Sequence, residues 1–179
     1  MFEYDGLEVK QVREEIDGLA QLFRGRKILE IGMEEGGLGS YLKHEYNCSM
    51  YGIDTTFHDR YPSIYDKYFI DDSIGSMAIE FARNYAPYHT VIIDGGHEGT
   101  YPIADFLNYH PFAIEAVVFD DINYPNVRKW WDMIKIPYRH IEIIRYNQIP
   151  SEGLLPKGAS LLLRLLTCDP LVIHQEKYL

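Results

Sequence analysis

Short apolar runs alternate along this chain with segments of helical spacing. Runs of β-forming residues predict strands at 28–31, 50–53, 68–70, 91–93 and 116–119. Apolar residues three and four positions apart predict helices at 38–42, 74–81, 103–107 and 127–134. Strands that alternate with helices are typical of α/β proteins with a parallel sheet.

The N-terminal part carries one more helical pattern. Its apolar residues at helical spacing are Val9, Val12, Ile16, Leu19 and Phe23. We expect one helix that covers a face of the first strand, and the residues RGRK at 24–27 are its basic end with a glycine cap. Residues 55–67 are irregular, and Ser73 is a competent N-cap for the helix after 68–70.

The first strand runs directly into a glycine-rich turn and a helix, in the sequence KILEIGMEEGGLGS at 27–40. Such a turn lets the backbone approach a ligand, and the helix points its free N–H groups at it. A dinucleotide fingerprint would need a second glycine at position 34, but Glu34 stands there and Glu35 follows. A P-loop is excluded because no Gly-Lys-Ser/Thr follows. The acidic turn favours a cationic ligand, and S-adenosylmethionine carries a sulfonium and an ammonium group against one carboxylate.

Carboxylates stand where the predicted strands end, at Asp54, Asp94, Asp120 and Asp121. The carboxyl ends of strands in an open parallel sheet face one crevice, so these side chains should converge. Carboxylates this close would not all stay ionised without a cation, and a hard divalent ion such as Mg²⁺ takes oxygen ligands. Asp54 is also placed to accept the ribose hydroxyls of an adenosine held over the glycine-rich turn.

Composition limits the number of domains, the kinds of partner and the cellular location. With 179 residues, 46% of them hydrophobic, the chain suits one core, so we expect a single domain over 1–179. The net charge of -10 and the pI near 5.1 argue against a nucleic-acid partner. Two cysteines without CxxC spacing indicate neither a zinc site nor a disulfide framework. No signal pattern or membrane-spanning run is present in the sequence, so we expect a cytoplasmic protein, with homo-oligomer formation left open.

Two motifs resemble a known family. The pattern Glu30-x-Gly32-x-x-x-Gly36 resembles motif I of the class I S-adenosylmethionine-dependent methyltransferases, in the variant of catechol O-methyltransferase. The carboxylates at 94, 120 and 121 resemble the metal ligands of that enzyme, of macrolide-sugar O-methyltransferases and of cephalosporin-hydroxylase-like proteins, and IDGGH at 93–97 resembles the IDG-x-H stretch of the last group. The resemblance covers about residues 27–121.

The resemblance implies a role for each candidate residue. It implies that Mg²⁺ or another divalent cation is held by Asp94, Asp120 and Asp121. His97 stands where the catechol enzyme has its catalytic lysine and the sugar enzymes a histidine, which implies a general base. The implied S-adenosylmethionine contacts are Glu30, Gly32, Gly36, Asp54, Asp72, Ser73 and Asp94.

The family fold ends with two strands that close the sheet, which 140–146 and 159–166 can supply. We therefore expect a Rossmann-like α/β domain with a seven-stranded, mostly parallel sheet, an antiparallel last strand and helices on both faces. The expected activity is metal-dependent methyl transfer from S-adenosylmethionine to a hydroxyl of a small molecule, such as a sugar, a polyketide or a catechol-like compound.

Other interpretations remain open. Asp54 could be a solvated strand-end carboxylate, His97 a hydrogen-bonded structural histidine, and the carboxylates at 72, 120 and 121 helix caps. The chain is short for the family, which leaves little material for a substrate lid and keeps a protein that binds S-adenosylmethionine or a metal without transfer as an alternative. A nicotinamide-dependent oxidoreductase is disfavoured by the acidic turn.

Overall fold

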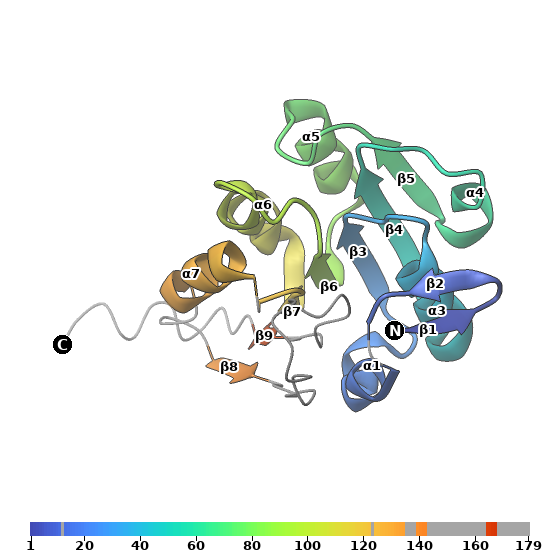
Figure 1. Ribbon diagram of the computed structural model, residues 1–179. Helices are drawn as coiled ribbons and strands as arrows, with labels where there is room; N and C mark the ends of the chain where they lie inside the picture. Colours follow the sequence, from blue (N-terminus) through green and yellow to red (C-terminus); the bar gives the residue numbers. More distant parts are fainter. Residues whose placement is uncertain (12, 123, 135–138, 143–163, 168–179) are drawn as a thin grey trace, which may run out of the picture.

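The computed structural model describes residues 1–11, 13–122, 124–134, 139–142 and 164–167 (Figure 1). Five strands pair in parallel in the order β5-β4-β3-β6-β7. Their bounds are Lys67–Ile70 (β5), Ser49–Asp54 (β4), Lys27–Ile31 (β3), Tyr88–Ile93 (β6) and Ala113–Phe119 (β7). Next to β7 lie β9 (Arg164–Thr167) and then β8 (Arg139–Glu142), each antiparallel to its neighbour. The expected α/β class with a parallel sheet is confirmed.

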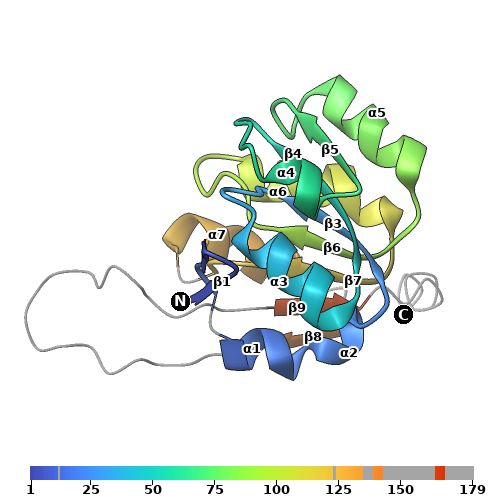
Figure 2. The ribbon, with the colours of Figure 1, turned by 90° about the vertical axis from the view of Figure 1, so that its right-hand side faces the viewer.

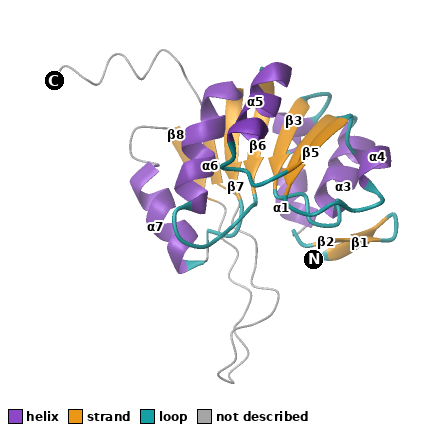
Figure 3. Cartoon of the chain, turned by 90° about the horizontal axis from the view of Figure 1, so that it is seen from above, coloured by secondary structure: helices purple, strands orange, loops and turns teal. Residues whose placement is uncertain are grey.

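Helices cover both faces of the sheet (Figures 2 and 3). One face carries α1 (Arg13–Gly18), α2 (Ala20–Phe23), α3 (Gly37–Tyr46) and α4 (Tyr61–Ile64). The other carries α5 (Ser76–Tyr85), α6 (Tyr101–Tyr109) and α7 (Pro125–Ile134), with a 3-10 turn at His110–Phe112. Successive strand residues point to opposite faces, so that Ile28 joins the first core and Leu29 the second. This double burial explains why the parallel strands are continuous apolar runs.

The single helix expected from Val9 to Phe23 is wrong in its first part. The chain begins with a hairpin of β1 (Phe2–Tyr4) and β2 (Leu7–Val9), turned at Asp5-Gly6, where both residues have positive φ. An Asp-Gly pair between alternating apolar residues is the signature of a type I′ hairpin turn. The helical part begins at Arg13 and is divided between α1 and α2. Gly25 has a φ of 67° after the C-cap residue Arg24, but its N–H bonds to the carbonyl of Tyr46 and not to a carbonyl of α2.

Two further local expectations change. The segment 55–67 is not wholly irregular, because it contains α4, whose Tyr61 is fully buried in the first core. Ser73 is not an N-cap, since α5 begins at Ser76 with Gly75 as its cap residue. The reason is a turn at 72–75 in which Gly75 donates its N–H to the carbonyl of Asp72, so the helix starts two residues later than expected.

The expected strands at 140–146 and 159–166 lie partly outside the described residues, which include only β8 and β9 there. Within the described part of the chain, no helix is long and apolar enough to cross a membrane.

Candidate functional site

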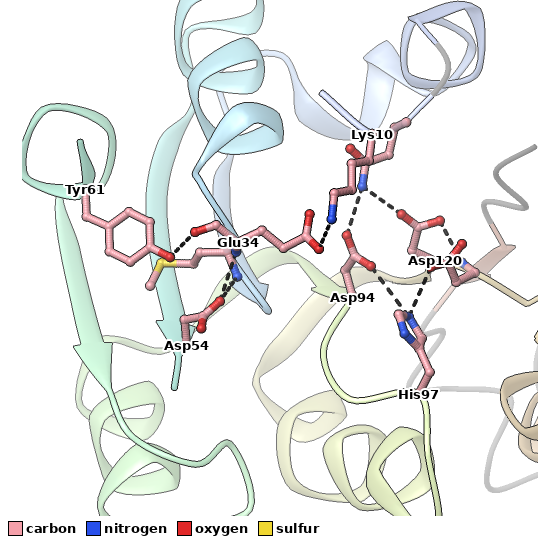
Figure 4. Close-up of polar contacts among 10 residues, drawn as sticks. Lys10, Glu34, Asp54, Tyr61, Asp94, His97 and Asp120 are labelled. Atoms are coloured by element: carbon pink, nitrogen blue, oxygen red, sulfur yellow. Dashed lines mark hydrogen bonds and ion pairs between the residues drawn. The ribbon is translucent and has the colours of Figure 1, made fainter. Parts of the chain in front are cut away.

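Two adjoining pockets lie at the carboxyl ends of the parallel strands. The first has a volume of about 180 Å³ and the second of about 320 Å³, and Gly32, Glu34 and Asp94 line both. Figure 4 shows Asp54 and Tyr61 on one side of this region, and Asp94, His97 and Asp120 on the other. An elongated ligand could therefore lie across the end of β3, at the crevice where α/β proteins bind ligands.

The glycine-rich turn needs glycine for reasons of packing. Gly32 has a φ of 87°, and a Cβ there would lie 2.3 Å from the backbone oxygen of Asp94. Gly36 has a φ of 88°, and a Cβ there would lie 2.8 Å from the side chain of Ile64 in α4. Gly32 lines both pockets, whereas Gly36 faces α4. These glycines let the turn pack against β6 and α4, which brings it close to the pockets.

Asp54 ties the turn to the end of β4. Its Oδ2 accepts the backbone N–H groups of Met33 at 2.7 Å and Glu34 at 2.9 Å, and its Oδ1 accepts that of Thr56 at 2.9 Å. Asp54 also lines the second pocket. The carboxylate therefore shapes the turn and still borders the space that a ribose would need.

Glu30 is a buried acid beneath the first pocket. Its side chain is 1% exposed, and its Oε2 accepts the hydroxyl of Tyr65 at 2.8 Å. Desolvation raises the pKa of Glu30 from 4.5 to about 8, although the Tyr65 hydrogen bond opposes that shift. The carboxyl group is therefore largely protonated near neutral pH in the ligand-free protein.

Glu30→Gln should change how stability depends on pH. Between the ordinary pKa of 4.5 and about 8, the unfolded chain releases a proton that the folded protein keeps, so the free energy of unfolding falls as pH rises through this window. The Gln variant lacks this loss, so its stability relative to wild type should rise by up to about 1.4 kcal/mol per pH unit. Urea unfolding at pH 5, 6.5 and 8 measures the difference. Glu80→Gln, on the exposed face of α5, is the matched control, and parallel pH profiles for Glu30→Gln and wild type would contradict the prediction.

The loop after β5 borders the second pocket. Asp72 and Ser73 both line it, and Tyr101 of α6 donates its hydroxyl to Asp72 Oδ2 at 2.9 Å. Tyr109, eight residues further along α6, donates its hydroxyl to the carbonyl of Ser73. The loop is thus held by α6 at the place where the resemblance puts an adenine.

A potential metal-binding group lies at the ends of β6 and β7. Asp94, His97 and Asp121 each offer a ligand atom, and these atoms lie within 4.8 Å of one another. His97 Nε2 is 3.2 Å from Asp121 Oδ2 and 3.9 Å from Asp94 Oδ1. Although it is buried, this nitrogen makes no hydrogen bond in the described structure. Two carboxylates around an unsatisfied imidazole nitrogen fit a divalent cation by the chemistry of their donor atoms.

Asp120 lies beside this group and is held by the protein. Its Oδ1 accepts the N–H of Asp121 at 2.7 Å, and its Oδ2 accepts the Gln11 amide at 2.8 Å. The same amide donates to Asp94 Oδ2 at 2.9 Å. Desolvation and the neighbouring carboxylates raise the pKa of Asp94 well above its usual range, and desolvation and Asp121 raise the pKa of Asp120 to about 7. The side-chain contacts that the structure describes for Asp120 and Asp121 lie within the acidic cluster, and the Asp121 carbonyl accepts the N–H of Tyr124, just before α7.

The loop that carries His97 is held by α7. Asn126 donates its side-chain amide to the carbonyls of His97 and Gly99, at 2.9 Å in each case. Trp130 donates its indole N–H to the same Gly99 carbonyl at 2.9 Å. The ring of Tyr124 stacks on the imidazole, with centroids 4.9 Å apart and an interplanar angle of 7°. The imidazole is therefore fixed from both its backbone and its ring face.

Several residues of the site carry no recognisable sequence signal. Lys10 forms an ion pair with Glu34 at 2.5 Å above the turn, and the neighbouring Gln11 reaches the acidic cluster. Both follow β2 directly and lie in the segment that the sequence pattern assigned to a helix. Tyr101 and Asn126 also lie in ordinary helical patterns. Their contacts depend on tertiary packing, which spacing along the chain does not reveal.

The sheet order, the helices on both faces and a site at the strand ends define a Rossmann-like doubly wound α/β protein. More particularly, solved structures of S-adenosylmethionine-dependent methyltransferases share this fold. The MycE methyltransferase of mycinamycin biosynthesis, in complex with Mg, SAH and mycinamycin VI, is similar with a TM-score of 0.58 and 16% identity, over 86% of this chain and 48% of that one. The Rossmann-like α/β class with a parallel sheet, which the sequence resemblance implies, is therefore confirmed.

Two other structures are similar over more of their own length. The O-methyltransferase from Bacillus cereus, in complex with SAH, has a TM-score of 0.60 and 13% identity, over 90% of this chain and 84% of that one. An rRNA methylase from Streptococcus thermophilus has a TM-score of 0.59 and 10% identity, over 91% and 99%. The chain spans about half the length of the MycE structures. No protein-family model matches the sequence, and neither does any curated protein.

Proposed function

We propose that this protein is a metal-dependent O-methyltransferase that moves a methyl group from S-adenosylmethionine to a hydroxyl of a small molecule such as a sugar, a polyketide or a catechol-like compound. The observation that carries the proposal is the group of Asp94, His97 and Asp121 beside the glycine-rich turn. We also propose that the chain forms one domain with a seven-stranded sheet whose last strand is antiparallel. A cytoplasmic location is part of the same proposal. The net charge of -10 supports a small-molecule acceptor over a nucleic acid.

The methyl donor would lie across the two pockets. In the second pocket, Asp54 would accept the ribose hydroxyls, and the loop with Asp72 and Ser73 would border the adenine. In the first pocket, Glu30 and Asp94 would face the ammonium group. The turn at Gly32 joins the pockets, which would place the sulfonium beside the acidic cluster.

The chain's own residues would bind the acceptor and move one proton. His97 Nε2 is free of other hydrogen bonds in the described structure, so it can take the proton from an acceptor hydroxyl placed next to it. Asn126 and Tyr124 would keep the imidazole in place during this step. The fixed positions of the two substrates would supply much of the acceleration, because the methyl donor is already activated.

Asp94, Asp120 and Asp121 would hold the cation, with His97 next to them. A bound Mg²⁺ supplies positive charge that favours the ionised form of the acceptor hydroxyl. Asp120 can take part without losing its protein contacts, because each carboxylate oxygen has two lone pairs.

Calorimetry and a methyl-transfer assay together test the proposal. S-Adenosylmethionine should bind the purified protein and NAD should not, which separates a methyltransferase from an oxidoreductase. A screen of hydroxyl acceptors with methyl-labelled donor, with MgCl₂ and with EDTA, then separates transfer from binding alone. Binding of the donor without transfer to any acceptor would favour the binding-protein alternative, and transfer that survives EDTA would remove the metal from the mechanism.

Lys10→Met should weaken the binding of S-adenosylmethionine by about 1.5- to 5-fold, the range of a partly exposed ion pair. The first pocket is lined by five acidic residues, and Lys10 is the one cation among its lining residues, so it is the candidate partner for the donor's carboxylate, which would take the place of Glu34 in the ion pair. Decarboxylated S-adenosylmethionine lacks that group, and its affinity should be nearly the same for the variant and wild type. Lys67→Met is the control, because it removes the same charge at the amino end of β5, whereas the pockets lie at the carboxyl ends of the strands. Equal losses for both ligands would contradict the assignment.

A further inference from the structure

Gln11 is fixed beneath the acidic cluster although it belongs to the N-terminal segment. It follows β2, where the backbone of Glu8 approaches α3 so closely that a Cβ on Gly37 would lie 2.0 Å from the Glu8 oxygen. Val9 is fully buried, and Gln11 is 3% exposed. The backbone on the N-terminal side of Gln11 is therefore anchored in the first core, which limits the positions open to its side chain.

The Gln11 amide joins two carboxylates. Its Nε2 donates to Asp94 Oδ2 at 2.9 Å and to Asp120 Oδ2 at 2.8 Å. A primary amide nitrogen has two hydrogens, so each carboxylate can receive one. With both carboxylates ionised, as around a bound cation, the opposite orientation would place the amide oxygen against carboxylate oxygens, so the amide nitrogen is the atom that faces them.

We infer that Gln11 is a positioning residue for the metal-binding carboxylates. Its two hydrogen bonds fix the side-chain rotations of Asp94 and Asp120, and they leave Asp94 Oδ1 directed to His97. A neutral amide can do this without repelling a divalent cation, whereas a lysine at the same place would compete with the cation for the carboxylates. The inference rests on the proposed function, and it adds a residue that the methyltransferase motifs do not contain.

Gln11→Leu tests the inference because leucine is similar in size and has no donor. Mn²⁺ binding to the protein without S-adenosylmethionine is measured by electron paramagnetic resonance, with MgCl₂ as competitor. This gives the metal affinity without any need for turnover. The affinity should fall by about 10- to 100-fold, the usual effect of removing a group that orients metal ligands. Gln21→Leu, the same change on the exposed side of α2, should leave the affinity unchanged.

Circular dichroism and thermal unfolding show whether each variant is folded, and Gln11→Ala removes the same donors if the leucine variant is not. A folded Gln11 variant with the metal affinity of wild type would overturn the inference and leave the proposed function standing. Wild-type protein that binds no Mn²⁺ would instead overturn the metal-dependent function, and the role of Gln11 with it. A loss of affinity confined to the Gln11 variants supports the inference.

Discussion

His97→Ala should slow methyl transfer by about 10²- to 10⁴-fold, which is the range for loss of a positioned general base. The Nε2 atom is buried without a hydrogen bond and faces two carboxylates, and the ring is held by Tyr124. Alanine removes the proton acceptor but none of the carboxylates, so the affinities for S-adenosylmethionine and for the metal should be retained. The single-turnover rate with saturating S-adenosylmethionine and MgCl₂, measured on an acceptor from the hydroxyl screen, gives the size of the loss.

The metal affinity of the same variant separates two roles for His97. Its nitrogen lies 3.2 Å from Asp121 Oδ2, so a ligand role is the competing interpretation. A rate loss with unchanged Mn²⁺ affinity supports the base, whereas parallel losses of rate and affinity would make His97 a ligand. Full activity in His97→Ala would exclude both roles. His44→Ala, on the exposed side of α3, controls for the loss of an imidazole elsewhere.

The parallel strands could be predicted because each is buried on two faces, as Ile28 and Leu29 illustrate, and therefore reads as an unbroken apolar run. The N-terminal hairpin could not be separated from the helix by spacing alone, because Val9 of β2 stands seven positions before Ile16 of α1 and thus continues the helical period. The Asp5-Gly6 turn was the available signal. This two-residue signal is short, whereas the apolar residues at helical spacing extend from Val9 to Phe23 and favoured a helix.

In the candidate site, too, some features could be predicted from the sequence and others depend on tertiary packing. The glycine-rich turn and the carboxylates at 94, 120 and 121 lie near one another because parallel strands end at one edge, whereas Asp54 lies across the turn from that group. The contacts of Gln11 join residues 83 and 109 positions apart, and they depend on how the hairpin packs against α3. The sequence alone did not predict that Asp54 bonds to the turn, since an acid at a strand end serves a ligand and a backbone N–H equally well.

Asp121→Asn should stabilise the metal-free protein and weaken metal binding. The charge of Asp121 contributes to the raised pKa of both Asp94 and Asp120, so its removal relieves repulsion within a buried cluster. Asp121 also has a φ of 53°, a conformation that Asn adopts readily. Together these effects should raise the free energy of unfolding by about 0.5 to 2 kcal/mol in EDTA. Metal affinity should fall at least about tenfold, since changes to groups that merely orient ligands already cost that much.

The two measurements distinguish a metal ligand from a helix cap. Asn caps a helix about as well as Asp, so a capping role would leave metal affinity unchanged. In wild type, a cation that binds only the folded state adds stability that grows with its concentration relative to its dissociation constant. Added MgCl₂ should therefore raise the melting temperature of wild type and of the exposed-site control Asp59→Asn much more than that of Asp121→Asn. An equal increase in all three proteins would remove Asp121 from the metal site, because the variant would then bind the cation as tightly without the charge.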